Sequence, residues 1–206
     1  MSGPIVVLGG GGHAKVVIAT ARAMGRDVLA CLDGNPARHG ESILGVPIPG
    51  DFSLASSYPD AEFILAIGDN ATRAKLADSL DLPWATLIHP AACVETDLPL
   101  GEGTVIFAGA IVQPDTRIGR HAILNTACSI DHDGVVGDFA HLAPGVHLSG
   151  NVTVGERVLL GVGSCGKPGV SIAAGIIVGA GAAVVNDLTE PGTYVGVPAR
   201  LRLGTS

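Results

Sequence analysis

The chain has few aromatic side chains and no long apolar segment. Its 206 residues include 1 Trp, 2 Tyr and 4 Phe, and its 12 Lys and Arg are scattered along a chain of net charge -7. This composition argues against a basic, base-stacking surface for nucleic acids. No run reaches the roughly 18 apolar residues of a membrane span, and the first residues lack the basic start of a secretory leader. We therefore expect a cytoplasmic protein that acts on a small molecule.

Cysteine is also scarce, and its four positions are far apart. Cys31, Cys93, Cys128 and Cys165 form no C-x-x-C pair. Neither a disulfide framework nor a zinc cluster is indicated, so reduced structural thiols are expected.

What the chain does have in its first part is an alternation of strand and helix patterns. Apolar strand-like runs stand at 5–10, 28–33, 63–68 and 85–89, and helical patterns at 13–24 and about 71–80. This order predicts a small α/β unit with a parallel sheet.

Beyond residue 90 the sequence follows a six-residue period. An aliphatic residue recurs at every sixth position over 94–160 and, after a miss at Gly166, again over 172–184. This period is typical of a hexapeptide parallel β-helix, in which three hexads make one triangular coil. Eighteen residues then advance the chain by one coil, which is roughly the 4.8 Å spacing between strands. We have no explanation from the sequence for Gly166 and the following Lys167.

The repeat, together with "VVLGGGGHAKVV", "AIGDN" and "YVGVPAR", resembles one branch of the hexapeptide-repeat acyltransferases. This branch contains sialic acid O-acetyltransferases and N-acetyltransferases that act on nucleotide-linked 4-amino sugars. The resemblance implies a sugar-nucleotide domain at 1–90, a left-handed β-helix at 91–190 and a segment at 191–206 that covers the coenzyme A groove. It also implies acetyl-CoA as donor, no metal, and a homotrimer with active sites between neighbouring prisms.

Coil arithmetic places His132 relative to two other residues. Gly150 follows it by eighteen residues and should lie one coil along, whereas His141 follows it by nine and should lie about half a circuit away. The two histidines can then serve one site only if two subunits contribute to it.

The resemblance implies that His132 is the general base, oriented by Asp133, and imidazole is suited to accepting the amine proton during acyl transfer. Gly150 N–H is the candidate donor to the oxyanion. The alternative is a corner histidine that bonds a neighbouring turn, and Asp131 is expected to be a solvated carboxylate only.

The same resemblance suggests a binding site for acetyl-CoA. Asn125 and His141 match positions that contact the donor, although hydrogen bonding between coils is an equal alternative. The expected groove also includes these residues: Gly150, Val162, Gly163, Ala180, Gly181 and Pro198.

The glycine loop follows the first strand and opens a helix, so its amides suit a phosphate. It fits G-x-G-x-x-A with an acid further on, but about 85 residues are too few for a full dinucleotide domain. The resemblance assigns the loop to a sugar nucleotide. The assigned residues are Gly11, Gly12 and His13 for the diphosphate and sugar, and Asp33, Asn35 and Asn70 for the base and ribose. Turn chemistry at strand ends is the alternative for Asp33 and Asn70, and Gly34 stands where relatives often carry a second acid.

The leading functional prediction is N-acetylation of a UDP-, GDP- or dTDP-linked amino sugar by direct attack, because no Cys neighbours His132. O-acetylation of a sugar hydroxyl is the close alternative. A zinc-dependent carbonic anhydrase on the same fold would need converging histidines that the spacing does not offer. A non-catalytic scaffold or nucleotide-binding regulator is the remaining alternative.

Overall fold

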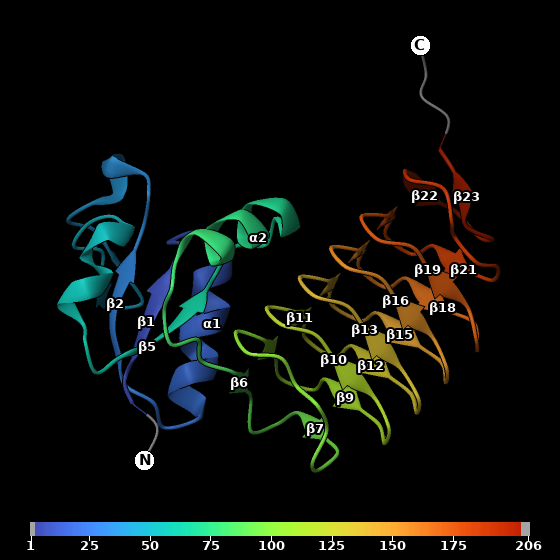
Figure 1. Cartoon of the computed structure of the whole chain (residues 1–206), viewed down its shortest axis with the longest axis horizontal. Coiled ribbons are helices and arrows are strands. Elements are labelled where there is room, and N and C mark those ends of the chain that lie inside the picture. Colours follow the sequence, from blue (N-terminus) through green and yellow to red (C-terminus); the bar gives the residue numbers. More distant parts are fainter. Residues whose placement is uncertain (1–2, 203–206) are drawn as a thin grey trace.

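The structure is a computed structural model that describes residues 3–202. An α/β domain stands beside a long triangular prism (Figure 1). The domain's parallel sheet has the order β2-β1-β5. Its strands and helices are β1 (Ile5–Leu8), β2 (Val28–Leu32), β5 (Glu62–Leu65), α1 (Gly12–Ala23) and α2 (Asn70–Ser79). Four smaller elements lie between β2 and α2: η1 (Pro36–Arg38), the β3 (Ser42–Ile43) and β4 (Val46–Pro47) hairpin, and η2 (Phe52–Ser57).

The prism has three parallel sheets, which we name after their first strands. The β6 sheet contains β6 (Leu87–Ile88), β8 (Val105–Ile106), β11 (Ile123–Leu124), β14 (His141–Leu142), β17 (Leu159–Leu160), β20 (Ile177–Val178), β22 (Thr193–Val195) and β23 (Arg200–Leu201). The β7 sheet contains β7 (Cys93–Val94), β9 (Ile111–Val112), β12 (Ser129–Ile130), β15 (His147–Leu148), β18 (Cys165–Gly166) and β21 (Ala183–Val184). The β10 sheet contains β10 (Arg117–Ile118), β13 (Val135–Val136), β16 (Thr153–Val154) and β19 (Ser171–Ile172). All pairs are parallel except β22 with β23.

The register follows the eighteen-residue coil that the repeat predicts. Ile130 pairs with Leu148, and Leu148 pairs with Gly166. The aliphatic residues of the repeat from position 106 on point inward and are buried in one continuous core. The predicted fold class is therefore confirmed.

Gly166 is a buried exception in this core. A Cβ at Gly166 would lie 3.1 Å from Leu148 Cδ2 and 3.7 Å from Val170 Cγ2, so these neighbours already fill the space that its side chain would need. An aliphatic side chain at position 166 would therefore have no room. Lys167, the next residue, is exposed.

The strand predicted at 85–89 belongs to the prism, which corrects its assignment to the α/β sheet. Residues Leu87 and Ile88 form β6, which pairs with β8. The period-two pattern predicted a strand but not which sheet it joins. At the other end of the chain, β22 and β23 extend the same sheet, and Tyr194 is buried in the prism core.

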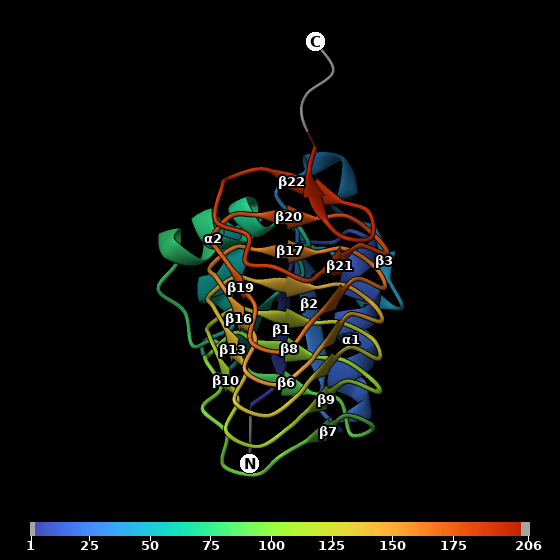
Figure 2. The ribbon, with the colours of Figure 1, turned by 90° about the vertical axis from the view of Figure 1, so that its right-hand side faces the viewer.

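The β6 sheet faces the α/β domain (Figure 2). Outward-facing Val105 and Ile123 pack with Val17 and Ile18 of α1 in a shared cluster. The domain therefore docks on one defined face of the prism.

Arg73 of α2 ties the two parts together. It is 1% exposed, and its guanidinium donates to five oxygens in the domain and the prism. Its acceptors are His121 O, Ile67 O, Gly68 O, Asn70 Oδ1 and Phe139 O, at 2.6–3.2 Å. Burial lowers the pKa of Arg73 to about 10, so it stays charged at neutral pH.

Candidate active site

His132 and Asp133 lie on the turn that joins β12 to β13, at the corner between the β7 and β10 sheets. Nδ1 of His132 is 2.8 Å from Asp133 Oδ2. Because a carboxylate only accepts, Nδ1 carries the hydrogen and Nε2 keeps its lone pair. Both side chains are exposed, at 61% and 52%. The imidazole is thus oriented to act as a base, because Nε2 is within reach of solvent or a ligand.

Asp133 also changes the protonation of its neighbour. Its hydrogen bond raises the pKa of His132 above the ordinary value of 6.5, and the charges of Asp133, Asp131 and Asp115 add to this effect. Asp131 is exposed and takes part through its charge alone.

Replacing Asp133 with asparagine is expected to move the acidic limb of the kcat/KM pH profile to lower pH. A base acts only when neutral, so activity is lost as the pH falls through the pKa of His132. Removing the carboxylate lowers that pKa, and the loss then begins at a lower pH. Profiles from pH 5 to 8.5 test this, and a limb that stays in place or moves upward would contradict the pairing.

Gly150 lies against the imidazole, as the coil arithmetic predicts. A Cβ on Gly150 would be 2.5 Å from His132 Cε1 and 2.6 Å from Nε2. Gly150 N–H has no acceptor among the residues that the structure describes, so it is available as a donor beside the base.

Gly150→Ala is expected to reduce kcat roughly 10- to 100-fold, because the added methyl pushes the ring away from its productive position. The backbone of Gly150 is not in the left-handed region, so alanine should fold normally. Steady-state kinetics with Ser149→Ala as control test the prediction. An unchanged kcat would show that the ring position does not matter.

Asn125 and His141 lie together on the β6 sheet side, one coil apart. Asn125 Nδ2 is 3.2 Å from His141 Nε2, and His141 Nδ1 is 3.3 Å from Gly68 O. The amide can only donate to Nε2, so Nδ1–H donates to Gly68 O. Burial lowers the pKa of His141 to about 4, in agreement with a neutral ring.

His13, at the start of α1, meets His141 across the docking surface. Their ring centroids are 6.2 Å apart, and Phe107 packs edge-on to His13 at 5.4 Å. Burial, together with the nearby His141 and Arg73, lowers the pKa of His13 to about 4. A residue predicted at the sugar and one predicted at the acetyl donor are therefore neighbours.

The glycine loop is closed by a carboxylate at the end of β2. Asp33 Oδ2 accepts from Gly10 N at 2.6 Å, and Oδ1 accepts from Asn35 N at 2.8 Å. Asn35 in turn accepts from Ala37 N. Gly11 and Gly12 are exposed and have open space above them. Asp33 and Asn35 shape the loop, and their contact with a base or ribose stays a prediction.

Asn70 connects α2 to the prism through its side-chain amide. It is 9% exposed, and its Nδ2 donates to Arg157 O at 3.0 Å and Val158 O at 3.1 Å. Its Oδ1 accepts from Arg73. Both ends of the amide are used in docking α2 on the prism, and the contact of Asn70 with a base or ribose stays a prediction.

Four residues of the predicted pantetheine groove lie at the corner between the β6 and β7 sheets, whereas Gly150 lies beside His132 at the corner between the β7 and β10 sheets. The four residues lie on two stacked turns, where Gly181 N donates to Val162 O at 2.8 Å. The exposed residues here are Val162, Gly163, Ala180 and Gly181, and Pro198 is exposed as well. A ledge of small residues is thus present, and what binds on it stays a prediction.

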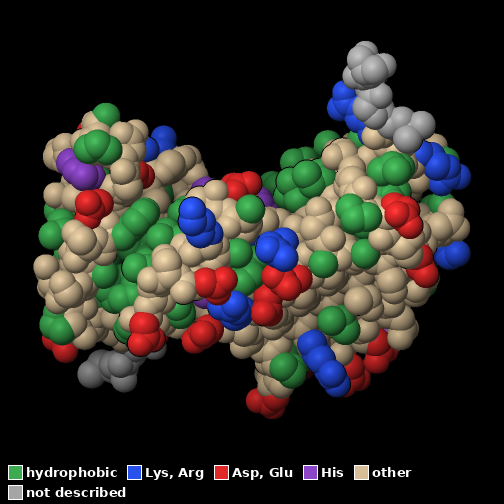
Figure 3. Space-filling model, turned by 45° about the horizontal axis from the view of Figure 1, so that its top comes forward, with side chains coloured by type: hydrophobic (Ala, Val, Ile, Leu, Met, Phe, Trp, Pro, Cys, Tyr) green, Lys and Arg blue, Asp and Glu red, His purple; other side chains and the backbone are tan. Residues whose placement is uncertain are grey.

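A hollow separates α2 from the upper part of the β6 sheet (Figure 3). Its volume is about 380 Å³, and its walls include Gly68, Asp69, Leu159 and Ile177. Since Gly68 also holds His141, the hollow adjoins the paired histidines.

His132 and His141 lie on opposite sides of the prism. The first is at the corner between the β7 and β10 sheets, and the second is on the β6 sheet, which faces away from that corner. Within one chain they do not share a site. The part of the chain that the structure describes contains no cluster of three or more metal-binding side chains.

Sequence reasoning missed the basic residues around the glycine loop. Lys15 and Arg38 both line a cavity of about 410 Å³ at the start of α1. Their proximity follows from the path of the chain after β2. The only signal in the sequence was an arginine soon after the strand-end Asp33.

Comparisons with known proteins show which family the chain resembles. Residues 4–80 match the model of the PglD N-terminal domain family. A 106-residue stretch is 40% identical to UDP-N-acetylbacillosamine N-acetyltransferase from Bacillus subtilis (strain 168). That match spans 48% of this chain and 49% of the relative, so the chain covers about half of its length.

A solved structure extends the likeness over the whole chain. Perosamine N-acetyltransferase from Caulobacter crescentus, as a histidine-to-asparagine variant in complex with CoA and GDP-perosamine, is 41% identical with a TM-score of 0.93. The match covers 99% of both chains. This chain belongs to the hexapeptide-repeat sugar N-acetyltransferases. Within that family, the acetyltransferase domain of PglB from Neisseria gonorrhoeae FA1090, solved with acetyl coenzyme A, is 33% identical with a TM-score of 0.92, covering 98% of this chain and 100% of that one. None of the helices within residues 3–202 of this acetyltransferase is long and apolar enough to span a membrane.

Proposed function

We propose that the protein transfers the acetyl group of acetyl-CoA to the amino group of a UDP-, GDP- or dTDP-linked sugar, with His132 as general base. The observation that carries the proposal is the hydrogen bond of 2.8 Å between His132 Nδ1 and Asp133, with the ring held over Gly150. Two of the relatives named above support the reaction type, because one is a UDP-N-acetylbacillosamine N-acetyltransferase and the other is a perosamine N-acetyltransferase solved with CoA and GDP-perosamine.

The roles of the residues follow from this geometry. Acetyl-CoA supplies an acyl group activated as a thioester. His132 Nε2 takes the proton from the amine nitrogen as the new C–N bond forms, while Asp133 holds the tautomer. Gly150 N–H donates to the oxygen that becomes negative, a contribution typically worth roughly 3 to 4 kcal/mol. The proton then leaves His132 for the departing CoA sulfur.

The ledge formed by Val162, Gly163, Ala180 and Gly181 fits the narrow arm of acetyl-CoA, because small exposed residues let a thin chain approach the backbone. Asn125, His141 and Pro198 would contact the same donor. The segment at 191–206 would cover the groove, although residues 203–206 lie outside the described residues.

A homotrimer is part of the proposal. The base lies on the corner of the prism that points away from the α/β domain, whereas His13 and the glycine loop lie on the opposite side. Another copy must therefore place its His132 beside the glycine loop and His13 of its neighbour. The cytoplasmic location expected from the sequence stays a prediction.

An acetyl-CoA assay against UDP-, GDP- and dTDP-linked amino sugars tests the proposal, with the matching hydroxy sugars as controls. We expect release of CoA only with an amino sugar. Turnover only with a hydroxy sugar would favour O-acetylation, and no turnover with bound ligands would favour a nucleotide-binding regulator.

A further inference from the structure

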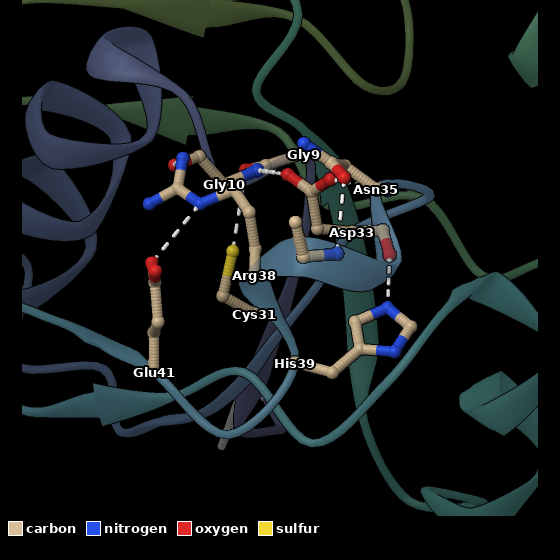
Figure 4. Close-up of polar contacts among 9 residues, drawn as sticks. Gly9, Gly10, Cys31, Asp33, Asn35, Arg38, His39 and Glu41 are labelled. Carbon is tan, nitrogen blue, oxygen red and sulfur yellow. Dashed lines mark hydrogen bonds and ion pairs between the residues drawn. The ribbon is translucent and has the colours of Figure 1, made fainter.

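Arg38, in η1, crosses the outer side of the glycine loop. Its Nη1 donates to Gly10 O, and its Nε donates to Glu41 Oε2 at 3.3 Å (Figure 4). Nη2 has no hydrogen-bond partner within residues 3–202. The guanidinium is therefore anchored to the loop while one edge, Nε with Nη2, is only weakly used.

Arg38 also lines a basic cavity. Lys15 and Arg38 line it together with the glycine loop and the β3–β4 hairpin, and none of its lining residues is acidic. Added Cβ atoms at Gly11 and Gly12 would meet nothing within 4 Å, so the loop leaves open space there.

The start of α1 has the same preference for negative charge. Gly11 offers no side-chain cap, and the first turn contains no acidic residue. Its free amides and the helix dipole therefore favour an anion. The amides, Lys15 and Arg38 converge on one cavity from separate segments.

We propose that Arg38 binds the diphosphate of the sugar nucleotide, and that this phosphate replaces Glu41 as the anionic partner of Arg38. This inference rests on the proposed function. The Glu41 contact is long for a charge-assisted hydrogen bond, which is typically about 2.7–2.9 Å, and the Glu41 side chain is 54% exposed. A phosphate can instead take Nε and Nη2 as a bidentate pair.

Glu41 is then a competitor that occupies Arg38 in the empty protein. The exchange selects a sugar that carries a nucleoside diphosphate over a free sugar, because only the former brings oxygens to both Arg38 and the loop amides. Arg38 is a binding residue for the substrate and has no part in proton transfer.

Calorimetric titration of the full chain with UDP, GDP and dTDP tests the exchange. For the nucleotide that the wild type binds, Arg38→Gln is expected to raise Kd about 10- to 100-fold. Glu41→Gln is expected to lower Kd by at least about twofold, because the competitor is gone. Arg38→Lys should recover part of the loss, as a point charge without the bidentate edge. Arg22→Gln, which removes a charge from the far end of α1, is the matched control.

Opposite signs for the two main variants separate recognition from a structural role. An unchanged Kd for Arg38→Gln, or a weaker Kd for Glu41→Gln, would overturn the inference. Melting curves confirm that each variant is folded. In the acetyl-CoA assay, Arg38→Gln should raise KM for the sugar nucleotide and leave KM for acetyl-CoA unchanged. If Arg38-dependent nucleotide binding holds while no amino sugar is acetylated, the proposed reaction fails and the Arg38 site stands.

Discussion

His132→Asn is expected to lower kcat for acetyl transfer by at least about 100-fold. Asparagine can hydrogen-bond but cannot accept the amine proton at neutral pH, so the attacking nitrogen keeps a proton that it must lose. The side chain is 61% exposed, so folding and ligand affinity should be preserved. Release of CoA at saturating concentrations of both substrates, together with titrations of each ligand, measures the two effects separately.

The matched control is His147→Asn. His147 is also exposed on the prism, where its Nδ1 is 2.8 Å from Ser129 Oγ, and it lies on β15, in the strand that leads to the Gly150 turn. Its replacement should leave the rate within about twofold of wild type. A His132→Asn enzyme with full activity would remove His132 from the mechanism.

Arg73→Met is expected to destabilise the protein by about 3 to 5 kcal/mol. Methionine fills part of the space but donates no hydrogen bond, which leaves five oxygens of the domain junction without their donor. Gly68 is one of the five, so the support of His141 weakens as well. Urea unfolding at fixed protein concentration measures the loss, because oligomerisation would otherwise change the apparent stability.

Lys75→Met on the exposed side of α2 is the control, and its effect should stay within about 0.5 kcal/mol. Arg73→Lys should fall between the two, because a single ammonium cannot reach all the acceptors that lie around the edges of the guanidinium. An Arg73→Met protein as stable as wild type would show that the domain junction does not depend on this residue.

The prism could be predicted from the sequence because the six-residue spacing of its aliphatic residues determines its geometry. A fixed coil of eighteen residues determines which residues stack, so the approach of Gly150 to His132 followed from counting alone. The same counting predicted that Asn125 lies near His141 and that His141 lies on the side of the prism away from His132.

The docking of the α/β domain could not be predicted in this way. The approach of His13 to His141 depends on a surface between two units of different period, held by Arg73 and Asn70. No spacing rule connects those units. For the same reason, the sequence pattern assigned the strand at 85–89 to the wrong sheet and gave no sign that Asn70 docks α2 on the prism.

The central claim is that each active site combines His132 of one copy with the glycine loop and His13 of another. Mixing two inactive variants tests this claim most directly. His132→Asn removes the base. Gly12→Glu places a negative charge in the phosphate site at an exposed position with free space, where a first-turn acid suits the helix. Each variant alone should be inactive. When the two are co-expressed in equal amounts and purified together, about one quarter of wild-type activity should return, because a randomly assembled site between two subunits has an even chance of an intact base and an even chance of an intact glycine loop. Mixed oligomers as inactive as the separate variants would show that base and glycine loop act within a single chain.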